Sequence, residues 1–474
     1  MNSKKFKLIL CLVCFFISYS RLIAAPSEIN YQGVLTDQQG NLVNGVRAMQ
    51  IKLYDAPTGG NKTYQQNIGN VTVADGIYSF KFGASGNGIA SALNGNDHLA
   101  LVVDSLEQPT RTKILAVPYA LKAKESETSA DVDYIKQTLI TLGVLPLFEP
   151  NVIVSTLAGA GYGYADGQGT LARFYAPIGV AVDGSGNVYV ADTGNHRIRK
   201  ITASGNVTTL AGAGYGYADG QGTFARFYAP SGVAVDGSGN VYVADQANNR
   251  IRKIDVGGNV STLAGSGTEG YANSQGTAAK FASPCGVAVD GSGNVYVADT
   301  RNNRIRKIDA GGNVTTLAGS GTEGNADGQG TGASFYYPSG VAVDGSGNVY
   351  VTSGIRIRKI DVGGNVTTLA GSATGGGFAD GQGTAARFGY LNGVAVDGSG
   401  NVYLADTSNY KIRKIDVGGN VTTLAGSGIQ SYVDGHGPSA MFYNPYGVAV
   451  GGNGNVYVAD YDSHQIRKIT IKEN

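Results

Sequence analysis

Five aspartates occur at the same place in a repeated pattern, and they are the first residues whose type and spacing could do chemistry. Each of them ends a short apolar run of the kind Val-Tyr-Val-Ala-Asp, and Ser353 takes the place of the aspartate in one further copy. The five are Asp192, Asp245, Asp299, Asp406 and Asp460. Carboxylates gathered around one axis could bind a hard cation such as calcium. The alternative, which we favour, is that each carboxylate accepts backbone N–H bonds in its own turn.

Histidine is the other residue type that could bind a metal. His196 and His464 each lie four residues after a repeat aspartate, and His436 lies in the segment that leads into the last copy. Three imidazoles form a common zinc site. A zinc site built from these histidines, with Asp192 and Asp460 as further candidate ligands, is therefore one hypothesis. The alternative is that histidine is simply the usual residue at this turn.

One variable residue precedes a glycine in every copy, just before the first apolar run. These six residues are expected to line the mouth of a central channel and are the candidate ligand contacts. They are Ile178, Ser231, Cys285, Ser339, Asn392 and Tyr446. None is acidic or a histidine, which disfavours a metal-centred hydrolase at that place. Cys285 could act as a nucleophile, but no base accompanies it, and a small buried thiol is the favoured interpretation.

Three further motifs are assigned to structure. The Asp-Gly-Ser-Gly-Asn segments lack the alternating acids and the final glutamate of an EF-hand loop and are predicted to be hairpin turns. The six Arg-Lys pairs, from Arg199-Lys200 to Arg467-Lys468, are balanced by acidic residues and are predicted to lie on a solvated strand face rather than to bind RNA. Glycosylation sequons begin at residues 206, 259, 313, 365 and 420, and their recurrence at one turn favours local turn chemistry.

A single unit, repeated six times, positions all of these residues. The valine that opens its first apolar run recurs every 53 or 54 residues, at Val180, Val233, Val287, Val341, Val394 and Val448. The first copy contains four strand-length pieces, at residues 179–183, 187–191, 197–201 and 206–210. They are rich in Val, Tyr and Ile and are separated by glycine turns, so each copy is predicted to be a four-stranded antiparallel sheet. Six such sheets stacked around an axis would bury both faces of each sheet.

The two ends of the repeated region are offset. The first outer strand, residues 152–157, precedes any inner strand, and the last copy ends near Ile471 without an outer strand of its own. We therefore predict that residues 152–157 complete the sheet of residues 447–471 and close the ring, which leaves no open edge. The alternative, an open solenoid, would need polar end caps, and none is visible.

The consensus of the repeat resembles a known family. Its pieces Gly-Val-Ala-Val-Asp, Gly-Asn-Val-Tyr-Val-Ala-Asp and Asn-His-Arg-Ile-Arg-Lys-Ile are similar to the NHL repeat, and residues 195–197 match two positions of the Asn-His-Leu triplet that names it. The linking pattern at residues 165–174 is typical of bacterial members. The resemblance covers residues 151–471 and implies an all-β, six-bladed β-propeller. Family members include binding scaffolds, extracellular sensor domains and a few enzymes, among them a zinc-dependent lyase, so the resemblance implies little about activity.

The chain before the repeats differs in pattern. Residues 1–25 have a basic start, an apolar run and small residues, so they are predicted to be a signal peptide. Residues 26–123 carry apolar runs of strand length between turns, which predicts a small β-sandwich, and they resemble a leading domain of secreted bacterial proteins. Residues 124–150 are predicted to form a short helix, with Ile135, Leu139 and Leu142 on one side, and a linker. The propeller would then occupy residues 151–474.

Composition limits the possible partners. The formal net charge of the 474 residues is +1, and loss of four basic residues with the leader leaves about −3, which disfavours nucleic acid or an anionic membrane as partner. Cys285 would be the one cysteine left after removal of the leader, so no intrachain disulfide is expected. No later segment is long and apolar enough for a transmembrane helix.

These observations favour a secreted, non-enzymatic protein at the outside or surface of a bacterial cell, monomeric and without a cofactor. Its propeller would bind a protein, peptide or glycan on the face that carries the long joints between copies. One alternative is a metal-dependent lyase or lactonase-type enzyme at the channel mouth, with calcium or zinc as its metal. A second alternative is a purely structural cell-surface protein.

Overall fold

The computed structural model describes residues 151–472, apart from residue 374, and the backbone of eight strands within residues 7–113. The chain divides into two compact units, Met1–Glu149 and Pro150–Asn474. Among the described residues, no helix has the length and apolar character needed to cross a membrane.

The described strands of the first unit form two antiparallel sheets. One sheet has the order β1 (Lys7–Cys11), β2 (Ile29–Thr36) and β5 (Ile77–Phe82). The other has the order β4 (Lys62–Val73), β3 (Gly45–Tyr54), β6 (His98–Val103) and β7 (Leu106–Glu107), with β8 (Thr112–Lys113) also paired to β6. Strand β4 was not predicted, because its first half is polar and shows no apolar run.

Other predictions for this unit stay open. The packing of the two sheets into a sandwich remains a prediction. Strand β1 falls within the predicted leader, so the signal peptide also remains a prediction. The expected helix around residues 135–142 lies outside the described residues.

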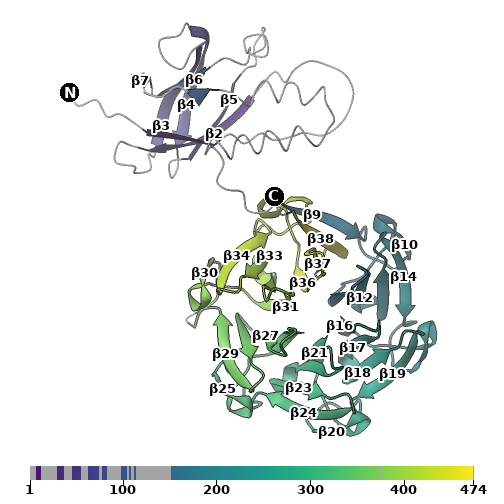
Figure 1. The fold of residues 1–474 in the computed structure, drawn as a ribbon. Helices are drawn as coiled ribbons and strands as arrows, with labels where there is room; N and C mark the ends of the chain where they lie inside the picture. Colours follow the sequence, from purple (N-terminus) through teal and green to yellow (C-terminus); the bar gives the residue numbers. More distant parts are fainter. Residues whose placement is uncertain are drawn as a thin grey trace. The chain divides into compact units, whose positions relative to one another are not determined.

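The second unit is a ring of six antiparallel sheets, the blades, arranged around a central axis (Figure 1). In blade one the order from the axis outward is β11 (Val180–Val182), β12 (Val188–Asp192), β13 (Arg197–Ile201), β14 (Asn206–Ala211) and β10 (Gly167–Gln168). The four predicted strands are present. The fifth, β10, was missed because two residues of pairing leave no pattern in the sequence. It comes from the joint that precedes β11 and covers the outer edge of its own blade.

The other blades repeat this arrangement in the same order from the axis outward. Blade two is β16 (Pro230–Val235), β17 (Val241–Asp245), β18 (Arg250–Ile254), β19 (Asn259–Ala264) and β15 (Gly220–Gln221). Blade three is β21 (Pro284–Val289), β22 (Val295–Asp299), β23 (Arg304–Ile308), β24 (Asn313–Ala318) and β20 (Ser274–Gln275). Blade four is β26 (Pro338–Val343), β27 (Val349–Ser353), β28 (Arg356–Ile360), β29 (Asn365–Ala370) and β25 (Gly328–Gln329). Blade five is β31 (Leu391–Val396), β32 (Val402–Asp406), β33 (Lys411–Ile415), β34 (Asn420–Ala425) and β30 (Gly381–Gln382).

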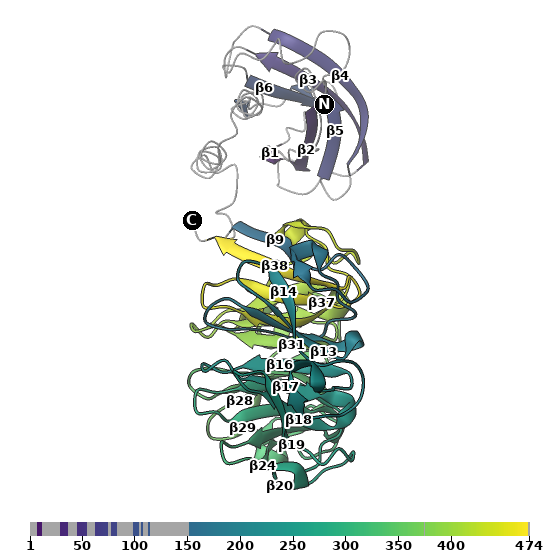
Figure 2. The same cartoon turned by 90° about the vertical axis from the view of Figure 1, so that its right-hand side faces the viewer.

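Blade six closes the ring as the sequence predicts. Its order is β36 (Pro445–Val450), β37 (Val456–Asp460), β38 (Gln465–Lys472), β9 (Asn151–Ala158) and β35 (Gly435–His436). Strand β9, from the start of the unit, pairs antiparallel with β38 from its end, in a register that runs from Ala158 opposite Ile466 to Asn151 opposite Lys472. Figures 1 and 2 both show these two strands side by side.

Short 3-10 helices occur at two places in the repeat. One set lies in the joints: Gly169–Leu171, Gly222–Phe224, Gly276–Ala278, Gly330–Gly332, Gly383–Ala385 and Gly437–Ser439. The other set links the second and third strands of four blades: Thr193–Asn195, Gln246–Asn248, Thr300–Asn302 and Thr407–Asn409.

Apolar side chains fill the space between neighbouring blades. The layer between blades one and two contains Tyr189 and Ile198 from blade one, Val233 and Val241 from blade two, and Phe227 from the joint. Equivalent layers fill the other interfaces. Since each blade buries its apolar faces only against its neighbours, stability depends on a complete ring.

The innermost strands lie close together around the axis. A Cβ atom on Gly179 would overlap the carbonyl oxygen of Ser231 in the next blade, and the same holds between Gly232 and Cys285. Glycine is therefore required at this position by the close approach of two backbones, which explains why every copy has it.

Candidate functional site

The antiparallel strand order places the connections of the blades on two opposite faces of the propeller. On the hairpin-turn face lie the turns between the first and second strands, such as residues 183–187, and between the third and fourth, such as residues 255–258. On the joint face lie the connections between the second and third strands, such as residues 193–196. Each joint also leaves the outer strand and enters the next inner strand on this second face. The candidate residues of the sequence can be placed on this frame.

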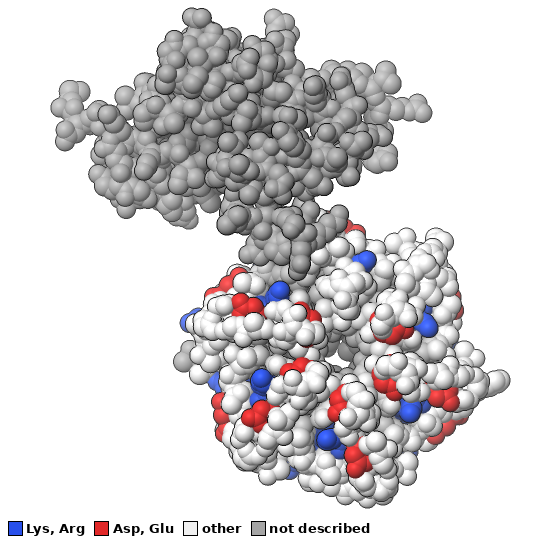
Figure 3. All heavy atoms as spheres, viewed as in Figure 1, with Lys and Arg blue, Asp and Glu red and all other residues white. Residues whose placement is uncertain are grey.

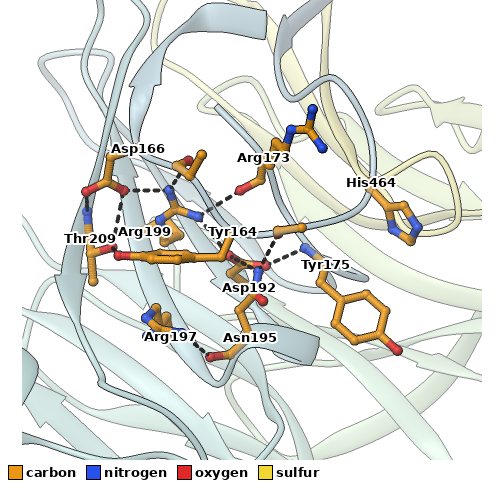
Figure 4. A network of polar contacts seen from close by, with 12 residues as sticks. Tyr164, Asp166, Arg173, Tyr175, Asp192, Asn195, Arg197, Arg199, Thr209 and His464 are labelled. Carbon is orange, nitrogen blue, oxygen red and sulfur yellow. Dashed lines mark hydrogen bonds and ion pairs between the residues drawn. The ribbon is translucent and has the colours of Figure 1, made fainter. Parts of the chain in front are cut away.

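The repeat aspartates serve structure in a way that was only partly predicted. Asp192 has no exposed surface. Its carboxylate accepts the N–H of Tyr175 at 2.8 Å, the side-chain amide of Asn195 at 2.9 Å and a guanidinium N–H of Arg199 at 2.8 Å (Figure 4). Tyr175 belongs to the preceding joint and not to the turn of the aspartate itself. Each repeat aspartate therefore fastens a joint to its blade.

The repeat arginines correct a prediction of the sequence. The first residue of each Arg-Lys pair has no exposed surface, so the prediction of a solvated strand face is wrong for the arginines. The guanidinium of Arg199 bonds Asp166 at 2.6 Å and the carbonyls of Ala165 at 2.7 Å and Arg173 at 3.0 Å, all in the joint (Figure 4). The sequence could not reveal this, because the partners lie 26 to 34 residues away.

Blade four lacks the buried carboxylate of this network. Ser353 replaces it, and its hydroxyl accepts the N–H of Tyr336 at 2.8 Å. Arg358 keeps its bonds to Asp327 and to the carbonyls of Ala326 and Ser334. Burial lowers the pKa of Arg358. In blade one, burial raises the pKa of Asp192, whereas the hydrogen bonds that its carboxylate accepts lower it. The joint thus stays attached by the arginine even where the aspartate is missing.

The structure does not bring the three candidate zinc ligands together. His436 pairs with Ile153 at the outer edge of blade six, whereas His464 precedes the part of β38 that pairs with Ala158, about 17 Å further along β9 at roughly 3.4 Å per residue. In the described residues no group of three His, Cys, Asp or Glu side chains could hold a metal ion. The carboxylates of Asp192 and Asp460 are each bonded to a buried arginine.

Two of the histidines have a defined structural role. His464 accepts the N–H of Ala176 at Nδ1 over 3.2 Å, and His196 accepts the N–H of Ala229 over 3.1 Å. In blades two and three, Asn249 and Asn303 use their amide oxygens in the same way. The shared hydrogen bond to the joint of the next blade explains why both His and Asn occur at this position.

The residues predicted to line the channel mouth lie at the start of the innermost strands, on the joint face. Ser231 is buried, and its hydroxyl donates to the carbonyl of Cys285 at 2.9 Å. Asn392 donates to the hydroxyl of Thr407 at 2.9 Å. The Ser231 bond joins blades two and three, whereas the Asn392 bond lies within blade five. Ser339 of blade four also donates to the carbonyls of Leu391 and Asn392 in blade five. Ile178, Cys285, Ser339, Asn392 and Tyr446 are half-buried.

Tyr446 and Cys285 belong to the opposite blades six and three. Burial raises the pKa of Tyr446, and the Cys285 thiol adds to the rise. The ring of Tyr446 also lies 5.3 Å from that of Tyr461. Burial raises the pKa of the Cys285 thiol as well, against a hydrogen bond with Ser231. A protonated thiol is a weak nucleophile, which supports the structural interpretation of Cys285.

Exposed aromatic side chains on the joint face were missed by the sequence reasoning. Tyr162 and Tyr215 stand in the Gly-Tyr-Gly segments of the first two joints, and both rings are largely exposed. Tyr337 and Tyr390 are exposed at the ends of later joints. The signal was present as a difference between copies, because the third joint has Thr268 in place of the first two tyrosines.

Acidic and basic side chains are mixed on the visible face of the propeller. Figure 3 shows them in small groups around the hollow at the centre of the ring, separated by uncharged surface. No single-sign patch stands out on that side.

Comparison with known proteins identifies both parts of the chain. A model described as the NHL repeat matches residues 174–201, 227–254, 281–308 and 442–469. A model described as a domain of unknown function, DUF8740, matches residues 30–111.

Two curated relatives match the repeats. The chloroplastic protein SUPPRESSOR OF QUENCHING 1 of Arabidopsis thaliana is 32% identical over 280 residues, which cover 54% of this chain and 26% of that protein. NHL repeat-containing protein 2 of Bos taurus is 31% identical over 329 residues, which cover 61% of this chain and 45% of that protein. The match thus spans less than half the length of either relative.

A solved structure matches the fold of nearly the whole chain. It is described as an auxiliary nutrient binding protein from Bacteroides thetaiotaomicron, and it superposes with a TM-score of 0.54 and 16% sequence identity over 95% of this chain and 96% of the other. At this identity the likeness shows the fold.

Proposed function

The chain carries NHL repeats that form a six-bladed β-propeller, and from this premise we propose that it is a binding or scaffold module whose ligand docks on the joint face. The ligand would be a protein, a peptide or a glycan. The single observation that carries the proposal is the set of exposed tyrosines on the joints. Tyrosine combines a large flat ring with a hydrogen-bonding hydroxyl and is enriched where proteins contact partners.

The two faces differ in the side chains that they expose. On the joint face, Tyr215 is 70% exposed and Tyr390 is 54% exposed. The backbone carbonyl of Tyr390 accepts the N–H of Thr407, which places it beside the connection between the second and third strands. The hairpin-turn face repeats the same short turns, with single exposed valines such as Val256 and Val417. The 3-10 helices of the joints reach these turns and add the exposed side chains Leu171 and Phe224 there. Exposed aromatic groups that differ from blade to blade are expected of a surface that recognises a ligand.

Export from a bacterial cell is part of the proposal. Its support is the leader-like character of residues 1–25. The likeness of fold to a protein described as nutrient binding supports the binding role instead. The rival enzyme function would need metal ligands that converge at one place. The described residues hold His196, His436 and His464 at separate places, so binding is the better supported function.

A pair of matched variants tests the proposal. The full chain is first screened against immobilised glycans, peptides and surface proteins. The ligands retained are then measured with a joint-face variant, Tyr215→Asp with Tyr390→Asp, and with a hairpin-turn variant, Val256→Asp with Val417→Asp. Each variant changes two strongly exposed apolar side chains to the same acid.

The proposal predicts that the joint-face variant weakens binding at least about tenfold, a difference of about 1.4 kcal/mol. The hairpin-turn variant should bind like the parent. The reverse order, or equal binding by both variants, would show that the ligand does not use the joint face.

A further inference from the structure

We propose that blades one and two carry two copies of one subsite for an acidic glycan, a chain of sugar units with carboxylate groups. The inference rests on the proposed binding function and names the class of ligand. Each subsite consists of two tyrosines, a histidine and an arginine. The first subsite is formed by Tyr162, Arg173, Tyr175 and His464, and the second by Tyr215, Arg226, Tyr228 and His196.

The aromatic rings of the two subsites have the same arrangement. In the first, the rings of Tyr162 and Tyr175 are 4.6 Å apart, and each lies within 5.9 Å of His464. The second repeats this geometry one blade further, where the rings of Tyr215 and Tyr228 are 6.2 Å apart and lie 6.2 and 5.7 Å from His196. The two constellations use the same residue types one blade apart, with a wider spacing of the tyrosine rings in the second, and they fit a ligand that is itself repetitive.

The fold does not require these tyrosines. Blade three has Thr268 at the place of Tyr162 and Tyr215, and Ala282 at the place of Tyr175 and Tyr228. The backbone hydrogen bond at this place is nevertheless the same. The N–H of Ala282 donates to the carboxylate of Asp299 at 2.8 Å, just as the N–H groups of Tyr175 and Tyr228 donate to the aspartates of blades one and two. Large exposed rings that folding can do without indicate a role in binding.

The backbone next to each outer tyrosine is open on one side, and on the other side Gly163 and Gly216 face the side chains of Arg173 and Arg226. Tyr162 lies between Gly161 and Gly163, and a Cβ on Gly161 would meet no atom within 4 Å. Gly214 beside Tyr215 is open in the same way. A flat exposed ring suits the C–H face of a sugar ring, because the aromatic face carries partial negative charge and C–H groups carry partial positive charge. A protein partner would more usually bring a side chain that needs a pocket.

The positive charges of Arg173 and Arg226 favour an acidic ligand. Arg173 and Arg226 are exposed, and within residues 151–472 neither of them forms an ion pair. Arg173 lies next to the outer tyrosine, with its guanidinium 3.5 Å from the carbonyl of Tyr162, and Figure 4 shows its side chain pointing away from the buried network. The guanidinium can bind a carboxylate through two parallel hydrogen bonds.

The carboxylates near the subsites are already occupied. Asp166 is held by Arg199 and by Thr209, and Asp219 by Arg252 and Thr262. Burial lowers the pKa of His196, so this imidazole is neutral at neutral pH. Arg226 therefore gives the second subsite an unpaired positive charge. In the first subsite the half-buried carboxylate of Asp462, which accepts a hydrogen bond from Asn444 and lies two residues before His464, opposes the charge of Arg173.

The test uses substitutions that the chain itself contains. Tyr162→Thr with Tyr175→Ala gives the first subsite the residues of blade three, and Tyr215→Thr with Tyr228→Ala does so for the second. Arg173→Ser with Arg226→Ser introduces the serine that blade four has as Ser334. Binding of the full chain to polygalacturonate is compared with binding to a neutral glucan, and unchanged melting temperatures confirm that the variants fold.

We expect polygalacturonate to bind the parent, with a loss of about tenfold for either single-subsite variant and of more than about a hundredfold for both together, because linked sites act through effective concentration. The arginine variant should lose affinity for polygalacturonate and its salt dependence. Equal binding of the neutral glucan, or full affinity after loss of both subsites, would overturn the inference. Retention of a peptide or protein on the joint face without polygalacturonate would overturn it too, while the proposed function would stand.

Discussion

Replacement of one buried arginine should loosen a joint from its blade. Arg252→Met removes a guanidinium that has no exposed surface and that bonds Asp245 at 2.7 Å and the carbonyls of Ala218 at 2.7 Å and Arg226 at 3.0 Å. Methionine has a similar length and can fill the space. Asp245, also without exposed surface, would then lose its charged partner.

The cost can be worked from this geometry. Removal of one partner of a buried ion pair destabilises a protein by about 3–5 kcal/mol, because the other charge stays buried and unpaired. At about 2–4 °C per kcal/mol for a large domain, the melting temperature should fall by roughly 6–20 °C. The deficit should shrink at lower pH. Burial already raises the pKa of Asp245, and a carboxyl whose folded pKa lies above its unfolded value gains stability as the pH falls.

Differential scanning calorimetry at pH 7.5 and pH 5 measures both effects. Lys253→Met on the neighbouring, half-buried side chain is the matched control and should change stability by less than about 1 kcal/mol. Asp245→Asn should cost less than Arg252→Met, because Arg252 would keep Asp219 and both carbonyls. If Arg252→Met melted at the same temperature as Lys253→Met, the arginine would not fasten the joint.

Three further predictions concern the ring. Deletion of residues 151–158 should expose the edge of β38. Calorimetry should then show a lower melting temperature, or light scattering should show self-association. A monomer of unchanged melting temperature would contradict ring closure by β9. Gly232→Ala should lower the free energy of unfolding by about 1–3 kcal/mol, because the added Cβ would overlap the carbonyl of Cys285. Gly237→Ala, at an exposed glycine, is the control, and equal midpoints of denaturant unfolding for the two variants would refute the close approach. His196 must be neutral to accept the N–H of Ala229, and burial lowers the pKa of His196. The stabilisation by this hydrogen bond is therefore present above about pH 6.5, the ordinary pKa of histidine, and is lost as the pH falls through the lower pKa of the folded protein. His196→Asn should therefore reduce the loss of melting temperature between pH 7.5 and pH 5, and an unchanged loss would exclude this role.

The fold was largely predictable because the same pattern of strands and turns occurs six times in the sequence. Short apolar runs at a fixed period indicate blades, and the offset of the two ends indicates closure by residues 152–157, as β9 and β38 confirm. The two-residue strands such as β10 were missed, since their pairing depends on the path of the joint and not on a local pattern. The prediction that the six Arg-Lys pairs lie on a solvated strand face was wrong for the arginines for a related reason. Alternation along a strand tells which side chains share a face, but it does not tell that a joint covers that face.

The candidate site was less accessible from sequence. The mouth residues were located from their place in the repeat, yet the hydrogen bonds of Ser231 and Ser339 to neighbouring blades depend on how the blades are stacked. The histidines were grouped as metal ligands because they are rare. The register of β35 against β9 places His436 far from His464, and no local pattern gives that register. The tyrosine subsites needed both a comparison between copies and the exposure of each ring.

The most direct test of the account is to map the bound ligand by hydroxyl-radical footprinting of the full chain, with and without the ligand retained in the screen. Protection is expected at the joints of blades one and two, residues 159–177 and 212–230, with the strongest effect at Tyr162 and Tyr215. The hairpin turns at residues 183–187 and 255–258 should react as in the free protein. Protection of these turns, with Tyr162 and Tyr215 still fully reactive, would contradict the assignment of the joint face as the binding surface.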